Sequence, residues 1–378
     1  MGSLDGVLVL DLSRKLPGPY CSMILADHGA RVITIEDRRF EGEGSFPTLL
    51  NRNKEHIALN LMSDEGREIF FRLVKRSDVV MEGFKPGVVT KLGINYEVLR
   101  GLNPRIVYCS ISGYGQDGPL RERPGHDINY LAESGVLDGM GSEETPFVPG
   151  VQVADIAGGS MNALSGILLA LYEREKSGLG QAIDISMTDC CLPLNAISLE
   201  LWQMTGMPPR RASGILSHRY AFYNVYQTKE GGFIVLGALE PHFWMAVCDY
   251  FGVPEYAVLQ FDEERREEII AFFAEQFAAK SRDEWEEELG ELLLCFSVVK
   301  SLPEAMDSHL FASRGMVVPL PGEADQGRKT FGVSIRMGRT PGAVRRAPEG
   351  FGKGGTRILR ELGYGEAKVA SLLDRGVI

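Results

Sequence analysis

The chain has 378 residues, 44% of them hydrophobic and 24% charged, which is ordinary for a soluble globular protein of two or three domains. Its 51 acidic and 40 basic residues give a net charge of −11, which argues against a nucleic-acid partner but leaves room for one local basic pocket. We expect no secretory leader and no membrane span. The six cysteines are scattered without metal-ligand spacing, so we predict no metal site and a reducing, cytoplasmic location.

Along the first 206 residues, short β-rich apolar runs alternate with helical patterns. This alternation predicts an α/β fold, a parallel sheet with helices on both faces, whose ligands bind at the carboxyl ends of the strands. The expected strands are residues 7–12, 31–36, 78–82, 105–111 and 181–187. The expected helices are residues 17–27, 64–75, 88–92, 96–101, 126–137, 155–176 and 189–204.

Two common nucleotide motifs are missing from this pattern. No Gly-x-Gly-x-x-Gly fingerprint follows the first predicted strand, and no phosphate loop ending in Gly-Lys-Ser/Thr is present. Their absence argues against an NAD enzyme and an NTPase. Residues 352–356 are Gly-rich and basic but follow no predicted strand, so we interpret them as a solvent turn.

The sequence changes character after a proline-basic linker at residues 207–211, which we take as a domain boundary. The region beyond it indicates a smaller α+β domain, followed by a tail with two short helices. Its expected elements are a hairpin at 222–227 and 233–237, helices at 242–251, 262–280 and 282–294, and tail helices at 356–363 and 366–373.

His126 is the first candidate catalytic residue, in the first turn of a predicted helix and within Pro-Gly-His-Asp-Ile-Asn-Tyr. The partial positive charge of a helix N-terminus disfavours an imidazolium, so a neutral imidazole there can accept a proton near pH 7. The alternative is an exposed His126 behind an N-cap at Gly125, with Asp127 as an ordinary first-turn acid.

Asp155 is the second candidate, before a predicted helix whose first turn contains Gly158 and Gly159. An N-cap role alone explains an aspartate at this position. The glycines weaken a helix and are not needed for a cap, but they would let a ligand carbonyl reach free N–H groups that hold an oxyanion. Capping and catalysis both remain open for Asp155.

Glu240 is the third candidate, between a predicted strand and a helix that begins at Pro241. A carboxylate at a strand end is often a helix cap. It can also orient a histidine by accepting a hydrogen bond from the ring N–H.

Read together, these segments resemble the family III CoA-transferases, in order and over nearly the whole chain. The segments that carry the resemblance are residues 9–13, 16–21, 25–30, 53–54, 78–87, 103–108, 339–342, 347–348 and 359–364. The resemblance implies a Rossmann-like large domain built from both termini, a small domain between them, and an interlocked homodimer with its site between subunits. The implied domains are residues 1–206, 207–325 and a returning segment 326–378.

The resemblance also implies catalytic roles. In the transferases the aspartate matching Asp155 is a nucleophile that carries acyl groups, whereas in the alpha-methylacyl-CoA racemase branch it is one of two bases. Residues 125–130 and 237–244 resemble the racemases, which makes His126 the opposing base, with Asp127 beside it, and Glu240 the orienter. The expected reaction is two-base inversion at C2 of a 2-methylacyl-CoA, through an enolate stabilised by helix amides.

Coenzyme A enters this reaction as part of the substrate, and the resemblance implies no cofactor or metal. Positively charged side chains must bind the phosphates of coenzyme A. The expected CoA contacts are Arg38, Arg52, Lys54, Lys85 and the loop Gly113, Tyr114 and Gly115, with solvated charges and a plain turn as the alternatives. The chain departs from the family pattern at Lys85, where arginine is commoner, and at Glu55-His56.

Two other functions stay open. CoA transfer between carboxylates needs Asp155 but not His126. A non-catalytic acyl-CoA-binding protein of the same fold needs neither residue.

Overall fold

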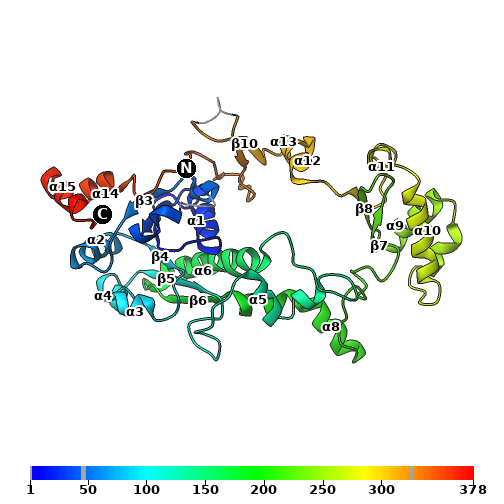
Figure 1. Ribbon diagram of the computed structural model, residues 1–378, viewed down its shortest axis with the longest axis horizontal. Helices are drawn as coiled ribbons and strands as arrows, with labels where there is room; N and C mark the ends of the chain where they lie inside the picture. The colour runs from blue at the N-terminus through cyan, green and yellow to red at the C-terminus, as the bar shows by residue number, and fades with distance from the viewer. Residues whose placement is uncertain (1, 44–47, 323–326) are drawn as a thin grey trace. The chain divides into compact units, whose positions relative to one another are not determined.

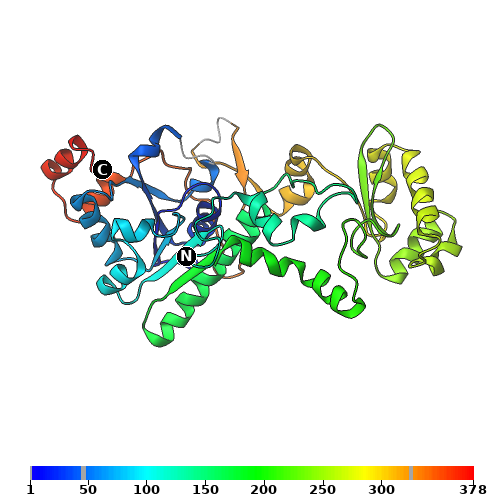
Figure 2. The same cartoon turned by 60° about the horizontal axis from the view of Figure 1, so that its bottom comes forward.

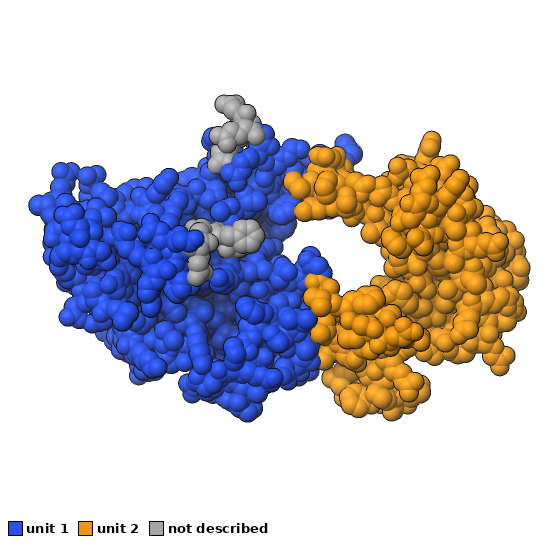
Figure 3. All heavy atoms as spheres, in the orientation of Figure 1, with its two compact units in different colours: residues 1–134, 150–194, 309–378 blue, residues 135–149, 195–308 orange. Residues whose placement is uncertain are grey.

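A computed structural model describes residues 2–43, 48–322 and 327–378. The chain divides into two compact units (Figure 3). Unit 1 comprises residues 1–134, 150–194 and 309–378, and unit 2 comprises residues 135–149 and 195–308. The units divide at residues 194/195 and 308/309, whereas the predicted boundaries are 206/207 and 325/326. The first division comes earlier because the helix before the proline-basic linker already belongs to unit 2.

Unit 1 contains a six-stranded, fully parallel sheet in the order β3-β2-β1-β4-β5-β6. This is the strand order of a doubly wound nucleotide-binding sheet, so the predicted Rossmann-like α/β architecture is observed for this unit. The strands are β1 (Leu8–Asp11), β2 (Arg31–Glu36), β3 (Glu55–Ala58), β4 (Val79–Glu82), β5 (Val107–Ser112) and β6 (Ala182–Ser186).

Helices cover the sheet as the apolar runs predict. One core joins the strands to α2 (Asp64–Val74), α3 (Val88–Leu92), α4 (Tyr96–Leu102), α14 (Gly355–Glu361) and α15 (Glu366–Asp374). Two further helices, α1 (Pro17–Asp27) and α6 (Met161–Ser177), pack against strands and against each other (Figures 1 and 2). The C-terminal helices thus share a core with the N-terminal strands.

Strand β3 was missed by the sequence analysis. Its residues, Glu-His-Ile-Ala, are all buried, yet two of the four are ionisable and give no β-rich pattern. Glu55 is held by Arg31 at 2.9 Å and by Arg357 at 3.3 Å, so ion pairs with distant segments allow the burial.

Unit 2 has a three-stranded antiparallel sheet in the order β7-β8-β9 with an aromatic core that includes Phe222, Trp244 and Phe273. The predicted hairpin is present. The elements are α8 (Ala196–Thr205), β7 (Tyr223–Gln227), β8 (Phe233–Gly237), α9 (Pro241–Tyr250), α10 (Arg266–Ala278), α11 (Arg282–Leu289), β9 (Phe296–Val298) and α12 (Leu302–Asp307). After α12 the chain rejoins unit 1 through α13 (His309–Ser313), β10 (Val317–Pro319) and β11 (Lys329–Phe331).

Candidate active site

The candidate site lies in unit 1, beyond the carboxyl ends of β5 and β6. Three short elements pack on one another there: α5 (Asp127–Glu133), the π-helical turn η4 (Ala154–Ser160) and α7 (Met187–Cys191). A π-helical segment is rare and often marks a functional site. The predicted helix 155–176 is therefore a π turn followed by α6.

His126 is the N-cap of α5, with extended backbone at φ −130° and ψ 174°, and its side chain is exposed. The expectation that His126 lies within the first turn, behind a cap at Gly125, was wrong by one residue. The Asn129 side chain accepts a hydrogen bond from the His126 N–H at 3.0 Å, which occupies the amide at the helix start.

Asp127 links the two candidate bases. Its Oδ1 accepts a hydrogen bond from the backbone N–H of Asp155 at 2.9 Å, which ties the start of α5 to η4. Asp155 is the second residue of this turn and Val153 is its N-cap, so Asp155 is not the cap. The structure therefore brings Asp155 beside Asp127 at the base of the helix that His126 begins.

The electrostatics of Asp155 suit acid–base work near neutrality. Burial, reinforced by the neighbouring charge of Asp127 and opposed by His126, raises the pKa of Asp155 to about 6. An aspartate with such a pKa can both hold and release a proton near pH 7, which an ordinary surface aspartate cannot.

The two glycines of η4 have a packing role. A side chain at Gly158 would lie 2.9 Å from the Cys191 sulfur and from the Met187 carbonyl oxygen, and one at Gly159 would lie 2.9 Å from Pro17. The space expected to admit a ligand carbonyl is thus filled by α7 and α1. The amide of Asp155, the second residue of the turn, donates to Asp127, so an enolate oxygen that binds to this amide would replace a carboxylate oxygen.

The loop after β5 also contacts the candidate site. The Gly113 carbonyl accepts a hydrogen bond from the Thr188 hydroxyl at 2.7 Å, and Gly115 adopts a left-handed φ of +87°. The Tyr114 ring meets the Tyr130 ring edge-on, with centroids 5.2 Å apart. Of the predicted CoA loop, Gly113 and Tyr114 therefore contact the helix that follows His126.

Glu240 lies in unit 2 as the N-cap of α9 and is exposed. Its carbonyl accepts hydrogen bonds from Phe243 and Trp244, at 3.0 and 3.1 Å, so its backbone caps the helix while its carboxylate stays available. Cys295, which sequence reasoning did not single out, lies close enough for Glu240 to raise its pKa together with burial. The pairing of Glu240 with His126 stays a prediction.

Two of the expected phosphate contacts are buried instead. Arg52 is 3% exposed and pairs with Asp27 through Nη2–Oδ2 at 2.6 Å. Lys54 is fully buried, donates to the Pro19 carbonyl at 2.9 Å, and has a pKa lowered to about 8 by burial against the opposing pull of Asp11. Both cations already have partners inside the domain, so neither presents an open charge.

Arg38 lies at a cavity of about 150 Å³, also lined by Lys353, Gly352 and Thr356. Its Nε donates to the Ile378 carbonyl at 2.9 Å, and Arg38 follows β2 at the carboxyl edge of the sheet. The Gly-rich segment 352–356, which we interpreted as a solvent turn, therefore lines a cavity with Arg38 and with Glu41, whose carboxylate lies 3.7 Å from the Arg38 guanidinium. Lys85 is 60% exposed and pairs with Glu122 at 3.1 Å.

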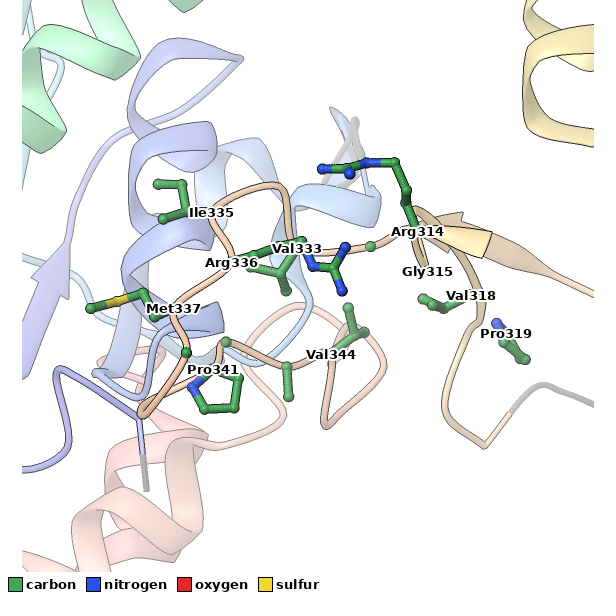
Figure 4. A pocket seen from close by; sticks show the side chains of 14 residues that line it. Arg314, Gly315, Val318, Pro319, Val333, Ile335, Arg336, Met337, Pro341 and Val344 are labelled. Atoms are coloured by element: carbon green, nitrogen blue, oxygen red, sulfur yellow. The ribbon is translucent and has the colours of Figure 1, made fainter. Parts of the chain in front are cut away.

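A larger cavity of about 510 Å³ is formed by the segment around β10 and the residues after β11 (Figure 4). Its walls combine apolar side chains, from Val318, Val333 and Val344, with two arginines, Arg314 and Arg336. It contains none of the predicted site residues and has no group that could move a proton at carbon.

One segment of the described chain, 154–177, is long and apolar enough to cross a membrane by length and composition alone. It begins with the turn that carries Asp155, and half of its most apolar window is buried inside the protein. Core helices pass the same test, so the finding is weak evidence for a span.

Comparison with known proteins identifies the family. The chain belongs to CoA-transferase family III, whose model matches residues 4–353, as its motifs predict. It is 33% identical to human alpha-methylacyl-CoA racemase over 100% of this chain and 97% of the relative, and 32% identical to an acyl-CoA transferase of Fusarium pseudograminearum over 100% and 88%. The structure of a CAIB/BAIF family protein from Brucella suis matches with a TM-score of 0.83 and 27% identity over 96% of this chain and 99% of that one. Racemase and transferase relatives are equally similar, so the reaction must be argued from the site.

Proposed function

We propose that this chain is a 2-methylacyl-CoA racemase that inverts C2 by two-base proton transfer. The observation that carries the proposal is the Asp127 bridge, which places Asp155, with its pKa near 6, beside the helix begun by His126. A thioester makes the C2 proton acidic because the enolate carries its charge on oxygen. One base removes this proton while the other supplies a proton to the opposite face.

The direct test is deuterium wash-in at C2 of a pure (S)-2-methylacyl-CoA incubated with the protein in D2O. We expect deuterium to enter and both epimers to form. Absence of deuterium exchange at C2 with several acyl-CoAs of different acyl chain would contradict the racemase proposal.

The second candidate is CoA transfer between carboxylates, and the transferase relative at 32% identity favours it. Here the Asp155 carboxylate attacks the thioester carbonyl and expels CoA thiolate to form an acyl-aspartyl anhydride. The thiolate then attacks the Asp155 carbonyl and expels the substrate carboxylate, which leaves an aspartyl-CoA thioester. Hydroxylamine would convert this thioester to a hydroxamate and borohydride would reduce it, and either product marks Asp155. Trapping without wash-in at C2 would assign the chain to the transferases.

The proposal includes a cytoplasmic homodimer. All six cysteines are free, as suits a reducing compartment. Helix α8 has no buried residue although it carries Leu199, Trp202 and Met204, and α6 exposes Leu169 and Tyr172. Apolar faces of this kind mark protein–protein contacts, and a second copy is the occupant that the family resemblance implies. Light scattering at micromolar concentration tests the dimer.

We propose that the cavity lined by Arg38 and Lys353 holds phosphates of CoA. Replacing Lys353 by alanine should raise KM for an acyl-CoA roughly 12- to 160-fold, because a charge-assisted hydrogen bond contributes roughly 1.5–3 kcal/mol. KM for the corresponding acyl-pantetheine thioester, which lacks the nucleotide, should not change. Lys85→Ala is the comparison, since Lys85 already pairs with Glu122. An equal rise in KM for both substrates would contradict the assignment.

The pH profile should report the raised pKa of Asp155. The active protonation state carries one proton shared between Asp155 and His126. A plot of kcat/KM against pH should therefore be bell-shaped, with lower values at both low and high pH. Replacing Asp127 by asparagine keeps an oxygen that can accept from the Asp155 N–H but removes a negative charge that raises the Asp155 pKa. The limb governed by Asp155 should therefore move to lower pH. If this part of the pH profile, measured between pH 4 and 9, is unchanged in the variant, Asp127 does not raise the pKa of Asp155.

A further inference from the structure

Tyr130 has no role in the reaction described so far, although it lies at the centre of the site. It stands one helical turn after His126 on α5 and is 6% exposed. Its hydroxyl donates a hydrogen bond to the Gly125 carbonyl at 2.6 Å. This carbonyl belongs to the peptide that joins Gly125 to His126.

Both polar groups of that peptide are held by side chains of α5. The carbonyl accepts from Tyr130, and the N–H of His126 donates to the Asn129 Oδ1 at 3.0 Å. The His126 carbonyl accepts from the Asn129 N–H at 2.8 Å. The backbone on either side of the His126 side chain is thereby fixed to the helix, which sets the direction in which the imidazole leaves the chain.

The Tyr130 ring also fixes the neighbouring loop. A side chain at Gly125 would lie 2.7 Å from the ring, and one at Gly113 would overlap it as well. The ring therefore packs directly on two glycine backbones, one before His126 and one in the loop after β5. The edge-on contact with Tyr114 extends this packing.

The phenol stays protonated at neutral pH and so acts as a hydrogen-bond donor. Burial, with smaller contributions from Asp155, Tyr114 and Asp127, raises the pKa of Tyr130 to about 12. A phenol in this state is not a base near pH 7.

We propose that Tyr130 is a positioning residue that aims the His126 imidazole by holding the Gly125–His126 peptide against α5. The inference rests on the proposed two-base function. It assigns Tyr130 no contact with the substrate.

The test compares Tyr130→Phe with Tyr226→Phe. Tyr226 is also buried, and its hydroxyl donates at 2.7 Å to Ala221, a carbonyl five residues earlier, as Tyr130 does to Gly125. Each variant loses one hydroxyl and keeps its ring. We expect Tyr130→Phe to lower kcat about tenfold at constant KM, since small misplacements of a reacting group cost up to about a hundredfold. Tyr226→Phe should keep kcat.

Two readouts separate positioning from a loss of stability. His126→Gln should abolish deuterium exchange from one of the two epimers. In D2O, Tyr130→Phe should slow deuterium exchange mainly from that same epimer. Equal losses from both epimers, or an unchanged kcat, would overturn the proposal. The second readout is amide hydrogen exchange at His126, which should be roughly 2- to 12-fold faster in Tyr130→Phe, the range for loss of one hydrogen bond, and unchanged in Tyr226→Phe.

The failures of the two proposals can be told apart. Absence of C2 exchange in the wild type overturns the proposed function. Unchanged amide exchange at His126 in Tyr130→Phe overturns the positioning role, whichever reaction the chain catalyses.

Discussion

Replacing Asp155 by asparagine should lower the racemisation rate about 10³-fold while leaving the protein folded. General acid–base catalysis by a positioned group contributes about 10²–10⁴-fold, and asparagine can neither take nor give the proton. The substitution keeps the shape of the side chain and the backbone N–H that donates to Asp127. The measurement is kcat for interconversion of the two epimers, with Asp117→Asn, at an exposed aspartate of unit 1, as the control.

The pattern of residual exchange makes this prediction specific to two bases. Asp155→Asn should still exchange deuterium into one epimer, through His126, without inverting it. His126→Gln should show the opposite preference through Asp155. Loss of exchange from both epimers in one variant, with exchange from both epimers retained in the other, would point to a single base, and full racemisation by either variant would remove that residue from the mechanism.

Much of unit 1 could be predicted because its strands and helices follow local apolar patterns. Helix α1 and strand β2 have the expected bounds, and β4 and β5 differ by one or two residues. The family motifs pointed to His126 and Asp155, whereas local sequence favoured an exposed His126 behind a helix cap and left capping and catalysis both open for Asp155. Only the structure shows the Asp127 hydrogen bond to Asp155, because it joins residues 28 apart in the chain.

The features that could not be predicted from the sequence depend on contacts between segments that lie far apart in the chain. The burial of Glu55 needs arginines at positions 31 and 357. The pocket at Arg38 needs Lys353, which looked like part of a solvent turn. Arg52 was expected to contact phosphate because of the family resemblance, with a solvated surface charge as the alternative, whereas its pairing with a residue 25 positions earlier buries it in the core.

Arg52 gives the largest expected effect on stability. It lies 3% exposed, and its partner Asp27 lies 2% exposed. Their paired hydrogen bonds measure 2.6 and 3.1 Å, Asn53 donates to Asp27 at 2.7 Å, and Arg52 donates to the Thr330 hydroxyl at 3.1 Å. This polar cluster joins α1 to the returning C-terminal segment of unit 1.

Arg52→Met should reduce the free energy of unfolding by about 3–5 kcal/mol, because it leaves the Asp27 carboxylate buried without its partner. Arg72→Met, which breaks an exposed pair with Glu68 at 2.7 Å, should cost less than about 1 kcal/mol. Urea denaturation followed by circular dichroism measures both values. A cost below 1 kcal/mol for Arg52→Met would show that the pair contributes little.

The double variant Asp27→Leu/Arg52→Met decides between a structural and a ligand-binding Arg52. Removing both charges eliminates the unpaired carboxylate, so much of the lost stability should return, as for other buried pairs replaced by apolar residues. If Arg52 only holds the core, the refolded double variant should bind acyl-CoA with an unchanged KM. If it contacts a phosphate, KM should stay raised although stability recovers. Because stability and KM are separate measurements, the same protein sample separates the contribution of Arg52 to stability from any contribution that it makes to the binding of CoA.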